Sequence, residues 1–172
     1  MEIEIIKGSI LDIDAEAIVN PANSHGWMAA GVSAAVKRIA GVDVENEAVN
    51  KGPIPVGSAI LTGGGGTKFR SIIHAQTMFS PIEKIGPGNI LKAVVSALKL
   101  ADESVYSSIA FPGMGMGRGG VDPESGTKMM INTIRSFQTT SLKKIILVDI
   151  RDDIVVAWKR FDNLWRSFDN PS

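Results

Sequence analysis

The sequence predicts an α/β fold with three layers, in which helices cover both faces of a mixed central sheet of about six strands. Three observations lead to this prediction. Segments with helical spacing alternate with short apolar runs along most of the 172-residue chain. Residues 144–150 form an apolar run of the kind found in strands that are covered on both faces. Two β-rich runs flank four consecutive glycines, which is typical of a hairpin and adds an antiparallel pair.

Six runs are expected to be strands. The first alternates apolar and polar residues, with Ile3 and Ile5 on one side. The second ends at Asn20–Pro21, a pair that favours a turn. The third and fourth are the two runs beside the glycines. The expected strands are residues 1–7, 15–20, 58–62, 69–75, 107–111 and 144–150.

Four longer segments are expected to be helices. The first has Val32, Val36 and Ile39 on one face, and Gly41 ends it. A later helix begins with Pro123 at its first position, and the side chain before it, Asp122, is the expected N-cap. The expected helices are residues 31–39, 89–103, 123–137 and 152–168, and residues 43–50 are expected to add a short helical piece.

The composition excludes several classes of function. The chain has 18 basic and 18 acidic side chains and no cysteine. A neutral chain has no general attraction for nucleic-acid phosphates, so nucleic acid is not the expected partner, although a local basic patch leaves RNA open. The absence of cysteine excludes disulfides, thiolate nucleophiles and cysteine zinc sites, and His25 without clustered carboxylates makes a poor metal site. We therefore expect neither a metal nor a cofactor.

The ends of the chain and its hydropathy predict a single cytoplasmic domain over residues 1–172. The N-terminal residues MEIEIIKGS carry acidic side chains where a signal peptide has basic ones, and they lack an apolar core. No apolar run approaches the ~20 residues that a membrane span requires. The length suits one domain of ordinary size, so membrane association is not expected.

Glycine is concentrated in two segments, for which we expect different roles. Residues 113–120 contain five glycines and connect an expected strand to an expected helix. Backbone N–H groups in such a loop can surround phosphate oxygens, and Arg118 adds a cation, so we expect an anion to bind there. The run Gly63–Gly66 precedes no helix. A hairpin needs the positive φ that glycine adopts, so we expect this run to turn the chain and bind nothing.

Polar residues near the end of the second strand are the other candidates for a site. Asn20 and Asn23 carry donors and acceptors without charge, which suits ribose hydroxyls or a base edge, but asparagine also satisfies loop backbone. We expect one of them to be structural and the other to face a ligand. His74 ends an expected strand and is expected to be partly buried and hydrogen-bonded. Three methionines suit either a pocket or the core. These are Met28, Met114 and Met116.

Taken together, these motifs resemble those of the macro domain, an ADP-ribose-binding module. The segments that carry the resemblance are AEAIVNPANS, GVSAAV, PVGSAILT, IIHA and SIAFPGMGMGRGG, and they extend over residues 3–158 in the order of the family. The combination of VNPAN with SIAFPGMG is specific, whereas each piece alone is not. The fold of the family, a mixed six-stranded sheet between helices, agrees with the fold predicted above.

The resemblance implies a role for each matching position. Asn23 would contact the distal ribose and is therefore the candidate catalytic residue. A first loop, which ends at the start of the first helix, and a second loop at residues 113–119 would hold the diphosphate. Ser9 and Ile10 would lie at the adenine, with Ile150 where several relatives place an aromatic ring. The implied binding residues are Ser9, Ile10, Ala22, Asn23, Ala30, Gly31, Val32, Ser33, Gly113, Met114, Gly115, Met116, Gly117, Arg118, Gly119 and Ile150.

Four positions depart from the pattern of the family. Ser9 replaces an aspartate that accepts from the adenine amino group, and Ser33 replaces an aspartate that many hydrolysing relatives carry. Gly119 replaces a common aromatic residue. Residues 28–30, Met-Ala-Ala, replace glycines of the first loop. An alanine at a position of positive φ costs about 1 kcal/mol, so we expect the first loop to be reshaped.

These residues support three hypotheses about function. The first is binding of ADP-ribose or a related nucleotide diphosphate. The second is hydrolysis of an ADP-ribose derivative, such as an ADP-ribosylated protein, O-acetyl-ADP-ribose or ADP-ribose phosphate. Asn23 would fix the ribose in that reaction, and the substrate's own diphosphate would act as the base. The third is binding of another nucleotide or an RNA end, with Asp149 as a substitute carboxylate near the base. Binding is the preferred hypothesis, because Ser33 supplies no carboxylate.

Overall fold

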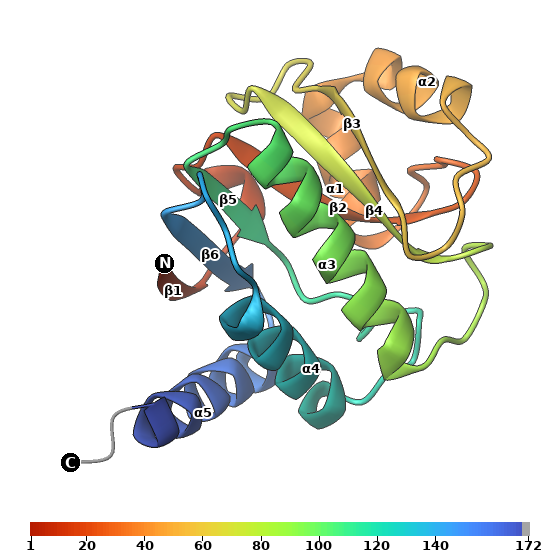
Figure 1. The fold of residues 1–172 in the computed structure, drawn as a ribbon. Helices are drawn as coiled ribbons and strands as arrows, with labels where there is room; N and C mark the ends of the chain where they lie inside the picture. Colours follow the sequence, from red (N-terminus) through yellow and green to blue (C-terminus); the bar gives the residue numbers. More distant parts are fainter. Residues whose placement is uncertain (170–172) are drawn as a thin grey trace.

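The structure, a computed structural model, describes residues 1–169 as a six-stranded mixed sheet between two layers of helices (Figure 1). The three-layer α/β fold that the sequence predicts is confirmed. The strands are β1 (Glu2–Lys7), β2 (Ala17–Asn23), β3 (Ala59–Gly63), β4 (Ser71–Met78), β5 (Ser108–Phe111) and β6 (Lys144–Asp149). The helices are the 3-10 turn η1 (Ile10–Asp12), α1 (Gly31–Ala40), α2 (Val42–Asn50), α3 (Pro87–Glu103), α4 (Pro123–Ser136) and α5 (Asp152–Asp169).

The order of the strands places five carboxyl ends at one edge of the sheet. The order is β1-β6-β5-β2-β4-β3. Every neighbouring pair is parallel except β3 with β4, which is antiparallel. In open α/β sheets of this kind, ligands bind beyond the carboxyl ends of the strands. The topology therefore directs the search for a site to the edge where β1, β6, β5, β2 and β4 end.

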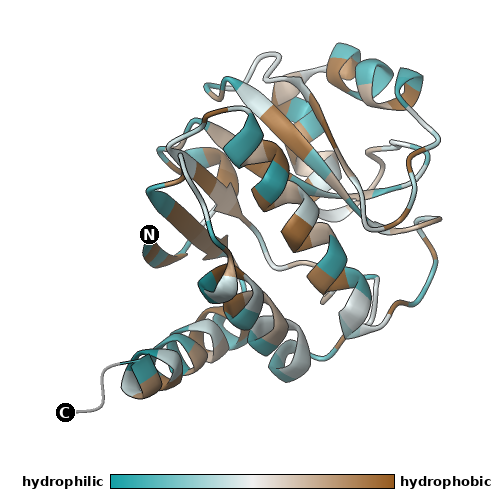
Figure 2. Cartoon of the chain, in the orientation of Figure 1, coloured by the Kyte–Doolittle hydropathy of each residue, from teal (hydrophilic) through white to brown (hydrophobic). Residues whose placement is uncertain are grey.

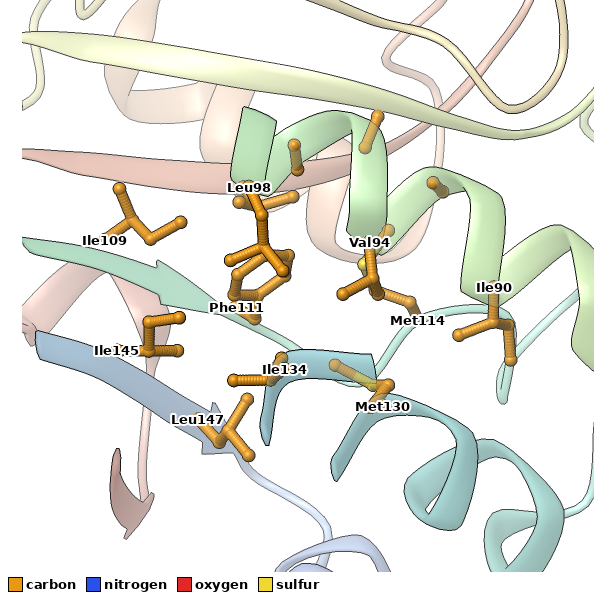
Figure 3. Packing of buried hydrophobic residues seen from close by; sticks show 14 of the residues in the cluster. Ile90, Val94, Leu98, Ile109, Phe111, Met114, Met130, Ile134, Ile145 and Leu147 are labelled. Carbon is orange, nitrogen blue, oxygen red and sulfur yellow. The ribbon is translucent and has the colours of Figure 1, made fainter. Parts of the chain in front are cut away.

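Successive residues of the strands enter two different apolar cores. In β6, Ile145 and Leu147 belong to the core beneath α3, α4 and α5, whereas Ile146 and Val148 belong to the core beneath α1 and α2. Figure 3 shows side chains of α3 and α4 meeting those of β5 and β6 in the first core. In Figure 2, apolar residues follow the strands and form stripes on the helices. Each fully buried Ile or Leu stabilises the fold by about 1.5–3 kcal/mol.

Specific polar contacts fix the start of α4 and hold α4 against α5. The Asp122 carboxylate accepts a hydrogen bond from the third residue beyond it, and Pro123 opens α4, so the predicted N-cap is confirmed. Arg135 of α4 pairs with the buried Asp162 of α5, which ties the two helices together. Arg166 of α5 also donates to Asp162, at 2.9 Å, so two arginines share this buried carboxylate. Within residues 1–169, no helix has the length and apolar character needed to cross a membrane.

Strand β2 is longer than the sequence predicts. The predicted turn at Asn20–Pro21 is wrong, because the strand continues to Asn23. β2 pairs with β4 along this whole length but with β5 only at Ala17 and Ile18. Pro21 therefore lies beyond the ladder to β5, where its missing N–H breaks no hydrogen bond on that side. The extension carries Asn23 to the carboxyl edge of the sheet.

The consecutive glycines Gly63–Gly66 lie in the β3–β4 hairpin, as predicted. The antiparallel pairing runs as far as Gly63 with Ser71. Gly65 has a φ of +56°, and a Cβ there would lie 2.1 Å from the carbonyl oxygen of Ala40 at the end of α1. The next residue, Gly66, donates a hydrogen bond to that oxygen at 3.0 Å. The hairpin therefore needs glycine because it packs directly against the C-terminal end of α1.

Replacing Gly65 with alanine should destabilise the fold strongly. The substitution combines a strained φ with a clash against backbone, and we expect the free energy of unfolding to fall by about 2 kcal/mol or more. Gly63→Ala is the matched control, because the nearest heavy atom to its added Cβ is 4.0 Å away. Urea denaturation of both variants checks the prediction. Equal losses of stability would show that the contact with α1 does not constrain the hairpin.

Candidate ligand-binding site

A cavity of about 520 Å³ opens at the carboxyl edge of the sheet. Its walls come from five segments, residues 8–11, 21–38, 77–81, 112–119 and 148–154, which follow or end the five parallel strands. The volume falls within the range of roughly 300–1,000 Å³ that is usual for sites of small ligands. The cavity is therefore where the topology leads us to expect a ligand.

The structure brings nearly all of the sequence-predicted site residues into this cavity. Met114 alone is outside its lining; it is fully buried in the first core, where Figure 3 shows it beside Val94. Met28 is also buried, in the second core, whereas Met116 both lines the cavity and packs against the first core. The predicted residues in the lining are Ser9, Ile10, Ala22, Asn23, Ala30, Gly31, Val32, Ser33, Gly113, Gly115, Met116, Gly117, Arg118, Gly119 and Ile150.

In the loop at residues 113–120, here named loop 2, most carbonyl groups are hydrogen-bonded to other described residues of the protein and most N–H groups are not. Five consecutive carbonyl groups accept from protein donors. They are Gly115 from Val121 N, Met116 from Arg151 Nη1, Gly117 from Gly120 N, Arg118 from Lys84 Nζ, and Gly119 from Ile85 N. Within residues 1–169, no protein group accepts from the N–H groups of residues 115–119. Loop 2 therefore has its acceptors satisfied and its donors available.

Most of the glycines in loop 2 are required by the protein itself. Four of them either have a positive φ or would place a Cβ within 3.0 Å of another group. Gly117 is different, because a Cβ there meets nothing within 4 Å, and the residue lines the cavity. The glycine content of loop 2 is thus explained largely by its own packing. Gly117 is the glycine of loop 2 whose lack of a side chain leaves open space in the cavity.

The N-terminus of α1 forms another part of the cavity wall. The N-cap residue, Ala30, makes no side-chain hydrogen bond to the helix, and the first helical bond runs from Ala34 N to Ala30 O. Within the described residues, the N–H groups of Gly31, Val32 and Ser33 donate to no protein acceptor. A helix N-terminus carries a partial positive charge, so these three donors suit an anion.

Residues 24–30, here named loop 1, are held in place without glycine at residues 28–30. Residues 28–30 avoid the positive φ that is costly for alanine, because within residues 1–169 Val105 is the one residue other than glycine with a positive φ. The Met28 side chain is buried in the second core, and its N–H donates to Glu45 Oε2 at 2.7 Å. Burial by itself raises the pKa of the Glu45 carboxyl, but Lys37 and the Met28 N–H outweigh it and lower the pKa. Glu45, a residue of α2, therefore holds loop 1 in place, and the loop does not need the backbone freedom of glycine at residues 28–30.

The two asparagines have different surroundings. Asn20 is fully buried and contacts His74 and Ser33. Asn23 lines the cavity, although its amide also organises loop 1: Nδ2 donates to Trp27 O at 2.8 Å and Oδ1 accepts from His25 N at 3.1 Å. Each amide atom retains one further hydrogen-bonding position. Asn20 is thus the structural member of the pair, and Asn23 is the one beside the cavity.

Both ring nitrogens of His74 are hydrogen-bonded, as the sequence predicts, but the residue is fully buried rather than partly buried, and β4 continues past it to Met78. Its Nδ1 is 3.2 Å from Asn20 Nδ2 and its Nε2 is 2.9 Å from Thr62 Oγ1. Burial lowers the pKa of His74 from 6.5 to about 4. The charge of Glu47 raises this pKa and the charge of Lys51 lowers it, and both effects are smaller than that of burial. The imidazole is therefore neutral at physiological pH.

The charged side chains of the lining are mainly basic. Arg38, Arg118 and Arg151 line the cavity, and Asp149 is the carboxylate among the lining residues of the described chain. Asp149 Oδ2 accepts from Gly113 N at 3.0 Å, and Oδ1 accepts from Arg151 N at 2.9 Å. Asp149 therefore fixes loop 2 to the end of β6. Within residues 1–169, no three His, Asp or Glu side chains gather as metal ligands.

Some lining residues were missed by the sequence analysis. Arg38 lies on the cavity side of α1 with Val32 and Ala35, so helical spacing from Val32 could have identified it. Trp27 is half exposed and its ring stacks on His25 at 4.2 Å between centroids. The end of β4 also lines the cavity, and no sequence signal shows that β4 runs parallel to β2.

Comparison with known proteins identifies the family. The family model described as Macro domain matches residues 19–130, and this chain belongs to the macro domain family. A protein of Aquifex aeolicus is 48% identical over 160 residues, covering 93% of this chain and 97% of that protein. A macro domain-containing protein of Caldanaerobacter subterraneus is 32% identical, covering 95% of this chain and 97% of that protein.

Solved structures with the same fold include macrodomains that contain nucleotides. The Oceanobacillus iheyensis macrodomain with ADP has a TM-score of 0.86 at 23% identity, covering 96% of this chain and 92% of that one. The Trypanosoma brucei macrodomain in complex with ADP-ribose has a TM-score of 0.83 at 24% identity, covering 92% and 68%. These similarities establish the fold.

The buried imidazole should make stability depend on pH. Between pH 6.5 and about 4 the unfolded chain binds a proton at His74 that the folded chain does not. The free energy of unfolding should therefore fall by up to about 3 kcal/mol as the pH drops through this window, with the full contribution present above it. Urea denaturation at several pH values, compared between wild type and His74→Gln, isolates this effect from that of the carboxylates. An identical pH dependence in the two proteins would contradict a neutral buried His74.

Proposed function

We propose that this chain binds ADP-ribose or a related nucleoside diphosphate, with the diphosphate between loop 2 and the N-terminus of α1. The observation that carries the proposal is a pair of donor sets in the lining of one cavity: the N–H groups of residues 115–119 and of residues 31–33 have no protein acceptor within the described chain. Of these residues, Ser33, Met116 and Gly119 are buried, and a buried N–H group without an acceptor is costly. Phosphate oxygens can satisfy several N–H groups at once. The similar folds with bound ADP or ADP-ribose support the same ligand class.

The charges of the cavity support an anionic ligand. Three arginines line it, and both oxygens of its carboxylate, Asp149, already accept from backbone N–H groups. Arg151 is partly neutralised by its ion pair with Asp153 and is held to the Met116 carbonyl. Arg118 makes no side-chain ion pair among the described residues, and its guanidinium is the cation we assign to the diphosphate.

The proposal places the two ends of the ligand at opposite ends of the sheet edge. Ser9 and Ile10 follow β1 and Ile150 follows β6, so we assign the base to this end. Asn23 ends β2, so we assign the second ribose to that side. Ser9 Oγ accepts from Leu11 N, which leaves its O–H as a donor toward the base. An ADP-ribosylated protein would present the same diphosphate, whereas an RNA end would present a terminal phosphate. Titration of such ligands distinguishes them from free ADP-ribose.

The cavity offers little for rapid hydrolysis. Water activation needs a base, and the lining supplies Asp149, which is committed to loop 2, and Ser33, which is not a base. A phosphate of the substrate would have to accept the proton while Asn23 orients the ribose. We therefore propose that binding is the main function and that hydrolysis of ADP-ribose derivatives, if it occurs, is slow.

Filling the open space at Gly117 should weaken ligand binding without unfolding the protein. Gly117→Val adds methyl groups where a Cβ meets nothing, so we expect the Kd for ADP-ribose to rise at least about tenfold by isothermal titration, a loss of roughly 1.4 kcal/mol. Gly86→Val, at the start of α3 and outside the cavity lining, is the matched control. AMP, with one phosphate, should bind less tightly than ADP.

Two results would contradict this proposal at different points. Absence of heat with ADP-ribose and with ADP at millimolar concentration would exclude the proposed ligand class. Unchanged affinity in Gly117→Val would remove loop 2 from the binding site while leaving the ligand class intact.

Release of ADP-ribose from a modified protein should be slow or undetectable under conditions in which ADP-ribose binds. The reason is the lack of an available carboxylate base. The measurement is a time course of release with the wild type and with Asn23→Ala. Rapid turnover by the wild type would contradict the assignment, and turnover unchanged in Asn23→Ala would exclude that residue from the reaction.

A further inference from the structure

Ser33 lies where the cavity meets a buried chain of hydrogen bonds. Its hydroxyl is 2.9 Å from Asn20 Oδ1 and 3.1 Å from the carbonyl oxygen of Pro21. The residue is buried in the first turn of α1 and still lines the cavity. Both neighbouring oxygens can only accept, so the single hydroxyl proton of Ser33 is donated into the protein.

The direction of this chain is determined by its far end. Thr62 Oγ1 donates to the carbonyl oxygen of Gly63 at 3.0 Å, and a carbonyl cannot donate in return. Thr62 therefore accepts from His74 Nε2–H, and the neutral imidazole accepts at Nδ1 from the Asn20 amide. This leaves the amide oxygen of Asn20 facing Ser33. Thr62, His74, Asn20 and Ser33 thus form one continuous hydrogen-bonded chain.

The conclusion for Ser33 is the same if the two amide atoms of Asn20 are exchanged. The amide nitrogen would then donate to Ser33 Oγ, and Ser33 would donate to the Pro21 carbonyl. In both arrangements the proton points away from the cavity. In both arrangements only a lone pair of the Ser33 oxygen is available to a ligand.

We propose that Ser33 is a specificity-determining residue that accepts a hydrogen bond from a ribose hydroxyl of the ligand. This inference rests on the proposed function and deepens it. A phosphate oxygen beside Ser33 would face a second acceptor, whereas a hydroxyl donates to it. Because Ser33 follows the end of β2, on the Asn23 side of the cavity, the hydroxyl belongs to the ribose that ADP-ribose has and ADP lacks. The Asn20 amide separates His74 from Ser33, so no base activates Ser33 as a nucleophile.

The test compares ADP-ribose with ADP in wild type and in Ser33→Ala by isothermal titration. Each protein gives a ratio of two dissociation constants, so a general loss of stability or of active fraction cancels. We expect the preference for ADP-ribose over ADP to fall about five- to tenfold in Ser33→Ala, because the lost hydrogen bond weakens the binding of ADP-ribose more than that of ADP. Ser33→Thr, which keeps the hydroxyl, should retain most of the preference.

The possible outcomes separate this inference from the proposed function. Equal losses for both ligands would place Ser33 at the diphosphate and overturn the inference, and so would an unchanged ratio. In either case the binding of ADP-ribose by the wild type would leave the proposed function standing. If the wild type binds neither ligand, the proposed function fails, and the inference fails with it.

Discussion

The site depends on one constraint of the backbone: parallel neighbouring strands have their carboxyl ends at the same edge. β1, β6, β5, β2 and β4 all obey it, and each strand is followed at that edge by a turn or helix. Segments far apart in the sequence are therefore brought together around one cavity. The two cores that cover the sheet hold these segments in place. The cavity is thus a consequence of the topology, and the side chains determine what it can bind.

The cavity presents different hydrogen-bonding groups along its length. Loop 2 and the start of α1 have their carbonyl oxygens bound by protein groups and contribute donors, which suit an anion. Ser33 contributes an acceptor, because its proton is used inside the protein. A ligand with a charged centre and hydroxyl groups beside it matches this order. The selectivity that we propose for the site therefore depends partly on buried residues, such as His74 and Thr62, that are not part of the cavity lining.

The features that the sequence predicted correctly depend on residues that are close together in the sequence. The cap at Asp122, the apolar face of α1 and the strand–loop–helix order around loop 2 are of this kind. The missed features depend on contacts made across the fold. The side chain of Met114 enters the core between two residues of the lining, and Glu45 holds loop 1 from a different helix. Pro21 remains in a strand because β5 has already ended beside it. Such contacts leave no periodic signal in the sequence.

The packing of the β3–β4 hairpin on α1 has a consequence for protein engineering. Exposed hairpin turns are ordinarily good places to insert an epitope or join a fluorescent domain. Here the turn glycines contact the carbonyl oxygen at the end of α1, and the other end of that helix forms a wall of the cavity. An insertion between Gly64 and Gly66 would displace the helix that carries Ser33. A reporter that must leave the cavity intact belongs elsewhere, for example at the exposed N-terminal residue of β1.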